Sequence, residues 1–216
     1  MEVVFLTNWY NDKNEQRAAE LKRCVEKTVD GFDVDRVICL HERGEECPVA
    51  GAENVLIPHR PVYKDFFDVA NQLTEKGDIV IISNTDIYPE GGVAELIENI
   101  KANEVFALSR WDEDSAGNKT HLDRWDSQDV WIFKAPINIP ANCDFRLGQA
   151  GCDNAIAERL QSVGYSVSNP SKDVKFIHYH ISGVLNYSDK DRIQKPYLLI
   201  TPHKLGETPS YNHITT

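Results

Sequence analysis

Apolar residues recur along the first half of the chain with two different periods. Short runs rich in β-branched residues predict buried strands, and apolar positions three or four residues apart predict helices. The predicted strands are residues 3–7, 34–40, 54–57, 78–82 and 105–109, and the predicted helices are 15–29, 63–74 and 93–102. This alternation predicts an α/β fold with a mixed, mostly parallel central sheet flanked by helices.

The second half of the chain has a different pattern. A polar, acid-rich segment covers residues 111–129, and it is followed by a predicted strand at 130–133, a helix at 155–163 and a strand at 174–180. After Pro196 we expect irregular chain. The whole pattern predicts a single domain over residues 1–216, with halves at 1–110 and 111–200 and an irregular tail at 201–216.

Charge and cysteine content exclude several classes of protein. The 216 residues carry 23 Lys and Arg against 34 Asp and Glu, a net charge of −11 that disfavours a broad nucleic-acid surface. No apolar run reaches the ~18 residues that a membrane span requires. Five cysteines without a C-x-x-C pair disfavour a disulfide framework or a structural zinc site. We therefore expect a cytoplasmic protein that is a monomer or part of a longer polypeptide.

Polar residues follow several of the predicted strands directly. Thr7, Asn8 and Tyr10 come after the first strand, and Asn84-Thr85-Asp86 follows the most hydrophobic strand, at 78–82. In an open parallel sheet, ligands bind beyond the carboxyl ends of the strands, so these groups predict a binding site there.

Asp86 is the first candidate metal ligand. The oxygens of Asn84 and Asp86 can face one Mg²⁺ or Mn²⁺, although the same residue types are also common in a plain turn. His178 and His180 share one face of a late strand, and either could complete a metal site or be a half-exposed strand-end residue.

Further candidates are a carboxylate, three cations and two aromatic residues. Asp153 lies at the start of a predicted helix, where it either caps the helix or points into the cleft. Arg17, Arg60 and Lys64 could meet a diphosphate, and Tyr10 or Tyr63 could stack on a base.

Other nucleotide-binding and hydrolase motifs are absent from the sequence. It contains no G-x-x-x-x-G-K-[ST] and no G-x-S-x-G, and no G-x-G-x-x-G follows the first strand. These absences disfavour P-loop nucleotidases, α/β-hydrolases and dinucleotide oxidoreductases.

Four segments together resemble glycosyltransferases of the GT-A fold. They are YKDFFD at 63–68, DIVIISNTDIY at 78–88, SQDVWIF at 127–133 and GCDN at 151–154. The similarity spans most of residues 1–190, and the chain resembles in particular the small glycosyltransferase domain encoded by large chlorella viruses. It implies a Rossmann-like half that binds a nucleotide-sugar and a smaller second half that binds the acceptor.

The resemblance also implies roles for individual residues. Asn84 replaces the first acid of the D-x-D motif, so Asp86 is the principal carboxylate on Mn²⁺ or Mg²⁺. A late histidine three residues before a glycine matches His180 and Gly183, with His178 as a second metal candidate. The implied catalytic residues are Asp153, Arg60 and Lys64. The implied nucleotide-sugar-binding residues are Thr7, Asn8, Tyr10, Arg17, Arg60, Tyr63, Lys64, Asn84, Thr85 and Asp86. The implied acceptor-binding residues are Trp111, Trp125 and Asp129.

The implied function is metal-assisted, retaining transfer of a hexose or deoxyhexose from a UDP-sugar, such as UDP-glucose, to a glycan or glycoprotein acceptor. For a viral protein, the site of action would be the host cytoplasm. Two alternatives stay open: a sugar-nucleotide nucleotidyltransferase, and a non-catalytic nucleotide- or carbohydrate-binding module. Asn84 keeps the second alternative open, because it removes one charge from the metal site.

Overall fold

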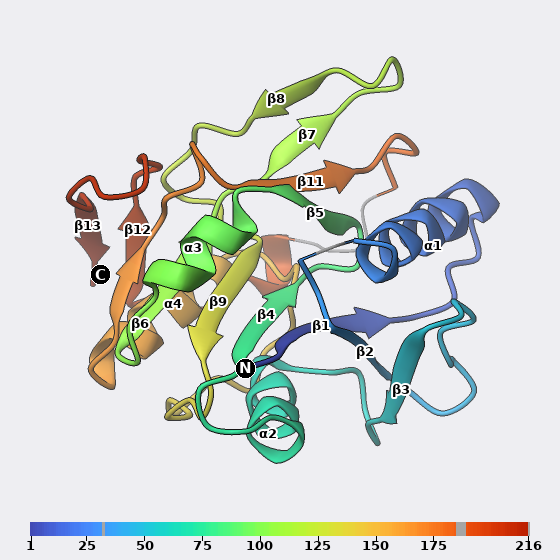
Figure 1. Ribbon diagram of the computed structural model, residues 1–216, viewed down its shortest axis with the longest axis horizontal. Coiled ribbons are helices and arrows are strands. Elements are labelled where there is room, and N and C mark those ends of the chain that lie inside the picture. The colour runs from blue at the N-terminus through green and yellow to red at the C-terminus, as the bar shows by residue number, and fades with distance from the viewer. Residues whose placement is uncertain (32, 185–188, 216) are drawn as a thin grey trace.

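A seven-stranded sheet forms the centre of the protein in a computed structural model that describes residues 1–31, 33–184 and 189–215 (Figure 1). The strand order is β10-β6-β9-β4-β1-β2-β3. The bounds of these strands are β1 (Val3–Trp9), β2 (Arg36–His41), β3 (Ala52–Leu56), β4 (Ile79–Ser83), β6 (Glu104–Leu108), β9 (Val130–Lys134) and β10 (Ser166–Ser168). Within the described part of the chain, β9 alone runs against its neighbours, β4 and β6, so the sheet is mixed and mostly parallel.

Helices cover both faces of this sheet. The helices are α1 (Glu15–Val29), α2 (Tyr63–Leu73), α3 (Val93–Asn99) and α4 (Cys152–Ser162), with a short 3-10 helix at Asp189–Asp191. Val80 and Ile82 of β4 pack with α2 and α4, whereas Ile79 and Ile81 pack with α1 and α3. Successive strand residues point to opposite faces, so a strand covered on both sides is apolar on both faces. All five residues of β4 are buried, and the first four are apolar.

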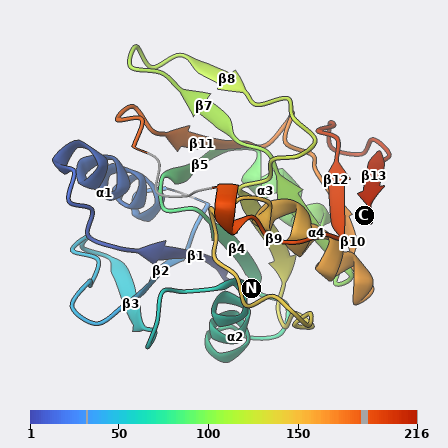
Figure 2. The same ribbon diagram turned by 180° about the vertical axis from the view of Figure 1, so that it is seen from behind.

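Two smaller sheets flank the central one. The first has the order β5-β11-β7-β8, made of β5 (Ile87–Gly91), β7 (Trp111–Glu113), β8 (Lys119–His121) and β11 (Lys175–Tyr179). It lies beside α1, and its β7–β8 hairpin projects from the body of the molecule in both views (Figures 1 and 2). The second pairs β12 (Tyr197–Ile200) with β13 (Tyr211–Ile214) at the opposite end of the molecule from α1.

The α/β fold with a mixed, mostly parallel central sheet, predicted from sequence, is confirmed, and one local prediction was wrong. The segment after Pro196, expected to be irregular, contains β12, whose four residues are all buried, and the expected tail 201–216 contains β13. Within the polar segment 111–129, for which no element was predicted, residues 111–121 form the β7–β8 hairpin, and β7 also pairs with β11. Among the described residues, no helix is both long and apolar enough to cross a membrane.

Candidate functional site

A cavity of about 500 Å³ opens at the carboxyl ends of β1, β4 and β6. Most of the residues proposed from sequence line it. They are Asn8, Tyr10, Arg17, Arg60, Asn84, Thr85, Asp86, Asp129, Asp153, His178 and His180. The polar residues that follow β1 and β4 lie close together, as expected, because these two strands are parallel neighbours in the sheet.

Asp86 is the buried anionic centre of this cavity. Its Oδ2 atom lies 2.5 Å from the Arg17 Nη2 atom and 3.3 Å from His178 Nε2. Burial alone would raise the pKa of Asp86, but the hydrogen bonds and charges of His178 and Arg17 hold it well below its ordinary value. Asp86 is thus ionised at any physiological pH and attracts cations.

His178 bridges two carboxylates. Its Nδ1 atom lies 2.7 Å from Asp112 Oδ1, and its Nε2 faces Asp86. Burial would lower the pKa of His178, but the hydrogen bonds to Asp112 and Asp86 raise it to about 9. The imidazole is therefore protonated at neutral pH in this state, and a metal ion could bind its Nε2 atom only after that proton leaves.

His180 adds a nitrogen that lacks a partner. Its Nε2 atom is buried and makes no hydrogen bond. Ligand atoms of Asp86, His178 and His180 all lie within 4.8 Å of one another, the one such trio found in the described residues. Because buried polar atoms are normally satisfied, the orphaned His180 nitrogen fits a site that accepts a cation. One carboxylate and two imidazoles suit Mn²⁺ better than Mg²⁺, which prefers oxygen ligands.

A second set of charges lies on the β9 side of the cavity. The Arg110 guanidinium bonds Asp112 at 2.8 Å and Asp129 at 3.3 Å. Asp129 accepts a hydrogen bond of 3.1 Å from the Asn84 side-chain amide. Asn84, which replaces an acid of the expected motif, is thus turned toward Asp129. Carboxylates and cations alternate across the floor of the cavity.

Asp153 lies at the start of α4, on the wall opposite α1. Its two oxygens accept hydrogen bonds from the backbone N–H groups of Asn154 (2.9 Å) and Gln128 (3.2 Å). Burial, with a smaller contribution from the charge of Asp129, raises the pKa of Asp153 to about 7. Gly151, the residue before α4, has a φ of +75°, and a Cβ there would lie 2.7 Å from the Tyr197 hydroxyl oxygen, so this position requires glycine.

Residues at the β1 end shape the cavity in two ways. Asn8 and Tyr10 line it, whereas Thr7 is fully buried behind it and donates a hydrogen bond to the Ser83 carbonyl. Thr85 lines the cavity and bonds the Asn8 carbonyl oxygen. Thr7 therefore supports the loop that would hold the ligand and does not reach the cavity itself.

Three sequence-based assignments do not survive the geometry. Tyr63 is 0% exposed and packs against Trp131 and Phe145, so it cannot stack on a base. Lys64 is exposed on α2, where it pairs with Asp68 at 2.6 Å. Trp111 belongs to β7 of the four-stranded sheet, its indole N–H donates to the Ser171 carbonyl, and it does not line the cavity.

The helical register explains the error at positions 63 and 64. The first turn of α2 follows Pro61 and is amphipathic, so one residue enters the core while the next points outward. Arg60, which precedes the helix, does line the cavity, and its guanidinium lies 5.6 Å from the Tyr10 ring centre.

Sequence reasoning gave no role to three side chains of this network. Arg110 directly follows the predicted strand at 105–109, where the strand-end rule also indicates a binding site, but no ligand was assigned to it. Asp112 belongs to the acid-rich segment, and only the pairing of β7 with β11 brings it to His178. Glu20, on α1, bonds Arg17 at 3.2 Å, and no local pattern distinguishes it from the other acids of that helix.

Solved structures of low sequence identity share this fold. GalNAc-T7, solved with UDP, GalNAc and Mn²⁺, matches 87% of this chain and 44% of its own, at 7% identity and a TM-score of 0.53. The mannosyltransferase PcManGT from Pyrobaculum calidifontis, in complex with GDP-Man and Mn²⁺, matches 86% of this chain and 58% of its own, at 10% identity and 0.51. TarS from S. aureus matches 83% of this chain and 37% of its own, at 10% identity and 0.52.

These neighbours are GT-A glycosyltransferases, and the similarity shows that this chain has the GT-A, Rossmann-like fold. The chain spans only 37–58% of their lengths. No protein-family model matches the sequence, and no curated protein is significantly similar to it. The likeness to chlorella virus domains is not tested by these comparisons and stays a prediction.

Proposed function

We propose that the protein is a metal-assisted glycosyltransferase that moves a hexose or deoxyhexose from a UDP-sugar to a glycan or glycoprotein acceptor. One observation carries the proposal: in a GT-A fold, the candidate metal ligands Asp86, His178 and His180 share one cavity with Asp153. Fold alone does not determine function, so the argument depends on the chemistry of this cavity.

Asp86, His178 and His180 are the residues that would hold Mn²⁺. The ion supplies a positive charge that neutralises a leaving diphosphate. Arg17 also contacts this carboxylate, with its Nη2 atom 2.5 Å from Asp86 Oδ2. Arg17 lines the cavity, where its guanidinium could contact phosphate oxygens.

The remaining lining residues divide into a nucleotide side and a sugar side. On the nucleotide side, Asn8 and Tyr10 offer a hydrogen-bonding carbonyl and an aromatic face for a base, and Arg60 offers charge to the diphosphate. On the sugar side, the Asp153 carboxylate can accept hydrogen bonds from hydroxyls and stabilise positive charge at the anomeric carbon. We propose retention of configuration, because of the likeness of His180 and Gly183 to retaining enzymes.

Arg60 and Lys64 provide a matched pair of variants, because the first lines the cavity and the second does not. Arg60→Ala should raise the Kd for UDP by about tenfold, since a hydrogen bond to a charged group contributes about 1.5–3 kcal/mol. Lys64→Ala should leave the Kd within about twofold, because exposed ion pairs contribute little. Isothermal titration with UDP measures both, and equal effects of the two substitutions would contradict the assignment of Arg60.

Trp125 is the proposed acceptor platform. Its side chain is 55% exposed, and it lies between Arg124 and Asp126, which both line the cavity. An exposed indole beside a binding cavity is suited to stacking on a sugar face. Trp125→Ala should raise the KM for the glycan acceptor about tenfold and leave acceptor-independent release of UDP unchanged. A parallel loss of donor hydrolysis would contradict this role.

The proposed function is tested by incubating the protein with a panel of UDP- and GDP-sugars and Mn²⁺, and measuring nucleoside diphosphate release. Release of UDP from a UDP-hexose, dependent on Mn²⁺, supports the proposal, and NMR of the product reports the anomeric configuration. Binding of UDP-sugars without release of UDP, in the presence of any of the acceptors tested, would favour a binding module. Formation of a UDP-sugar from UTP and a sugar phosphate would favour a nucleotidyltransferase.

We further propose a cytoplasmic site of action, since such nucleotide-sugars are made there and the five cysteines are all free and buried. Fractionation of cells expressing the tagged protein tests this, and recovery with a membrane or secreted fraction would contradict it.

A further inference from the structure

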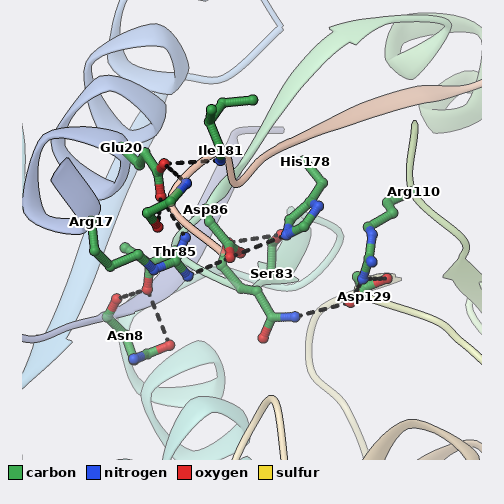
Figure 3. A network of polar contacts seen from close by, with 12 residues as sticks. Asn8, Arg17, Glu20, Ser83, Thr85, Asp86, Arg110, Asp129, His178 and Ile181 are labelled. Atoms are coloured by element: carbon green, nitrogen blue, oxygen red, sulfur yellow. Dashed lines mark hydrogen bonds and ion pairs between the residues drawn. The ribbon is translucent and has the colours of Figure 1, made fainter. Parts of the chain in front are cut away.

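Glu20 is a buried carboxylate that the proposed catalytic steps do not use. It lies on α1 and is 3% exposed. A buried carboxylate is costly unless each oxygen is hydrogen-bonded. Here both oxygens are satisfied by two donors each, from two different parts of the molecule (Figure 3).

The first set of donors is the turn that follows β11. The backbone N–H groups of Ile181 and Ser182 donate to Glu20 Oε1 at 2.9 Å and 2.6 Å. The Ser182 hydroxyl donates to Oε2 at 2.9 Å. His180 directly follows β11, and Ile181 comes next, so these three bonds fix the backbone immediately after His180.

The second partner is Arg17, one turn earlier on the same helix. Its Nη1 atom bonds Glu20 Oε2 at 3.2 Å, while its Nη2 atom bonds Asp86 at 2.5 Å. A guanidinium is planar and rigid, so holding one nitrogen orients the other. A single carboxylate thus fixes both the turn after His180 and the cation that faces Asp86.

We propose that Glu20 is a positioning residue of the metal site: it fixes the His180 imidazole through its bonds to Ile181 and Ser182. The inference rests on the proposed function for the identity of the ion. The alternative is that Glu20 only tethers α1 to the turn, in which case its loss would change stability without changing the site. Groups that orient metal ligands typically affect metal affinity by about 10–100-fold.

Glu20→Gln tests the proposal with little change of shape. The neutral amide oxygen accepts hydrogen bonds more weakly than a carboxylate oxygen, so the bonds from the Ile181 and Ser182 amides are weakened. The amide has only one oxygen, so the acceptor of the Arg17 Nη1 atom is lost. Glu26→Gln is the matched control, because Glu26 lies on the same helix, is exposed and pairs only with Lys22 among the ion pairs of the described residues. Both variants are compared with wild type by hydrogen exchange, by ¹⁵N NMR of the His180 ring and by Mn²⁺ titration followed by EPR.

In Glu20→Gln, the amides of Ile181 and Ser182 should exchange at least tenfold faster, the His180 ring resonances should shift, and the Kd for Mn²⁺ should rise at least tenfold. Glu26→Gln should leave all three unchanged. Unchanged His180 resonances, or a change in unfolding midpoint as the sole effect, would overturn the proposal.

The outcomes separate this proposal from the proposed function. If wild-type protein binds no Mn²⁺, the metal-assisted mechanism fails, and the exchange and His180 readouts still decide the role of Glu20. If Glu20→Gln does not fold, Ser182→Ala removes one of the three turn contacts. That variant should speed exchange at Ser182 about threefold and shift the His180 resonances, and the absence of both effects would overturn the inference.

Discussion

Asp86→Asn is expected to weaken Mn²⁺ binding at least a hundredfold and to lower kcat/KM for UDP release about a thousandfold. The substitution leaves two neutral imidazoles and no anion among the proposed ligands. A bound metal ion contributes several kcal/mol to charge stabilisation in the transition state, and about 4 kcal/mol corresponds to a thousandfold change in rate. Mn²⁺ titration followed by EPR and a steady-state assay of UDP release measure the two effects.

The same substitution also affects folding, which requires a control. Arg17 is 6% exposed and would lose the partner of its Nη2 atom, and breaking a buried ion pair typically costs about 3–5 kcal/mol. Urea unfolding therefore accompanies the assay, and Asp123→Asn, whose carboxylate is 65% exposed, serves as the control variant. A folded Asp86→Asn protein with wild-type Mn²⁺ affinity would remove Asp86 from the metal site.

Asp153→Asn is expected to lower turnover by about 10²–10⁴-fold while making the protein more stable at pH 8. The pKa of Asp153 is about 7 in the folded protein against an ordinary 3.8, because burial disfavours the charged form. A raised carboxyl pKa favours folding fully below pH 4, and this contribution is lost as pH rises to about 7. At about 1.36 kcal/mol per pKa unit, the loss at pH 8 is on the order of 4 kcal/mol.

The pH dependence of both properties identifies the role of Asp153. If the reaction uses the ionised carboxylate, wild-type kcat/KM rises with pH through about 7. The neutral amide of Asp153→Asn cannot titrate, so its profile should lack this limb and its stability should not fall between pH 4 and 7. Urea unfolding at pH 5 and pH 8 measures the second effect. A variant that is less stable than wild type at pH 8, or fully active, would contradict the assignment.

The sequence predicts the central sheet well because its signals are local. The strand at 78–82 is apolar at nearly every position, and α1 begins where Asn14 accepts a hydrogen bond from the Arg17 amide, as an N-cap residue does. The smaller sheets are made of three to five residues per strand and depend on partners far along the chain. Trp111 pairs with Ile177 and with His121, and the residues around position 111 do not have a pattern that predicts either pairing.

For the candidate site, too, residues with a local sequence signal were predicted, and residues that depend on distant partners were missed. Asn8 and Asp86 were found by the rule that ligands bind at strand ends, and that rule depends only on topology. The assignments of Tyr63 and Lys64 were wrong because neighbouring residues of an amphipathic helix point in different directions. Tyr63 points into the core, and Lys64 points to solvent. Glu20 was missed because its partners, Ile181 and Ser182, are about 160 positions away.

The burial of β12 bears on how fragments of this protein should be chosen for expression. Leu198 and Ile200 are 0% exposed and pack in the same core cluster as Ile156 of α4, the helix that carries Asp153. A recombinant fragment that ends at Pro196, where the sequence pattern predicts the last regular element to be over, would lose the apolar residues that pack against α4. Expression vectors for this domain should therefore extend at least to Ile214, which pairs with Tyr197 in the terminal hairpin.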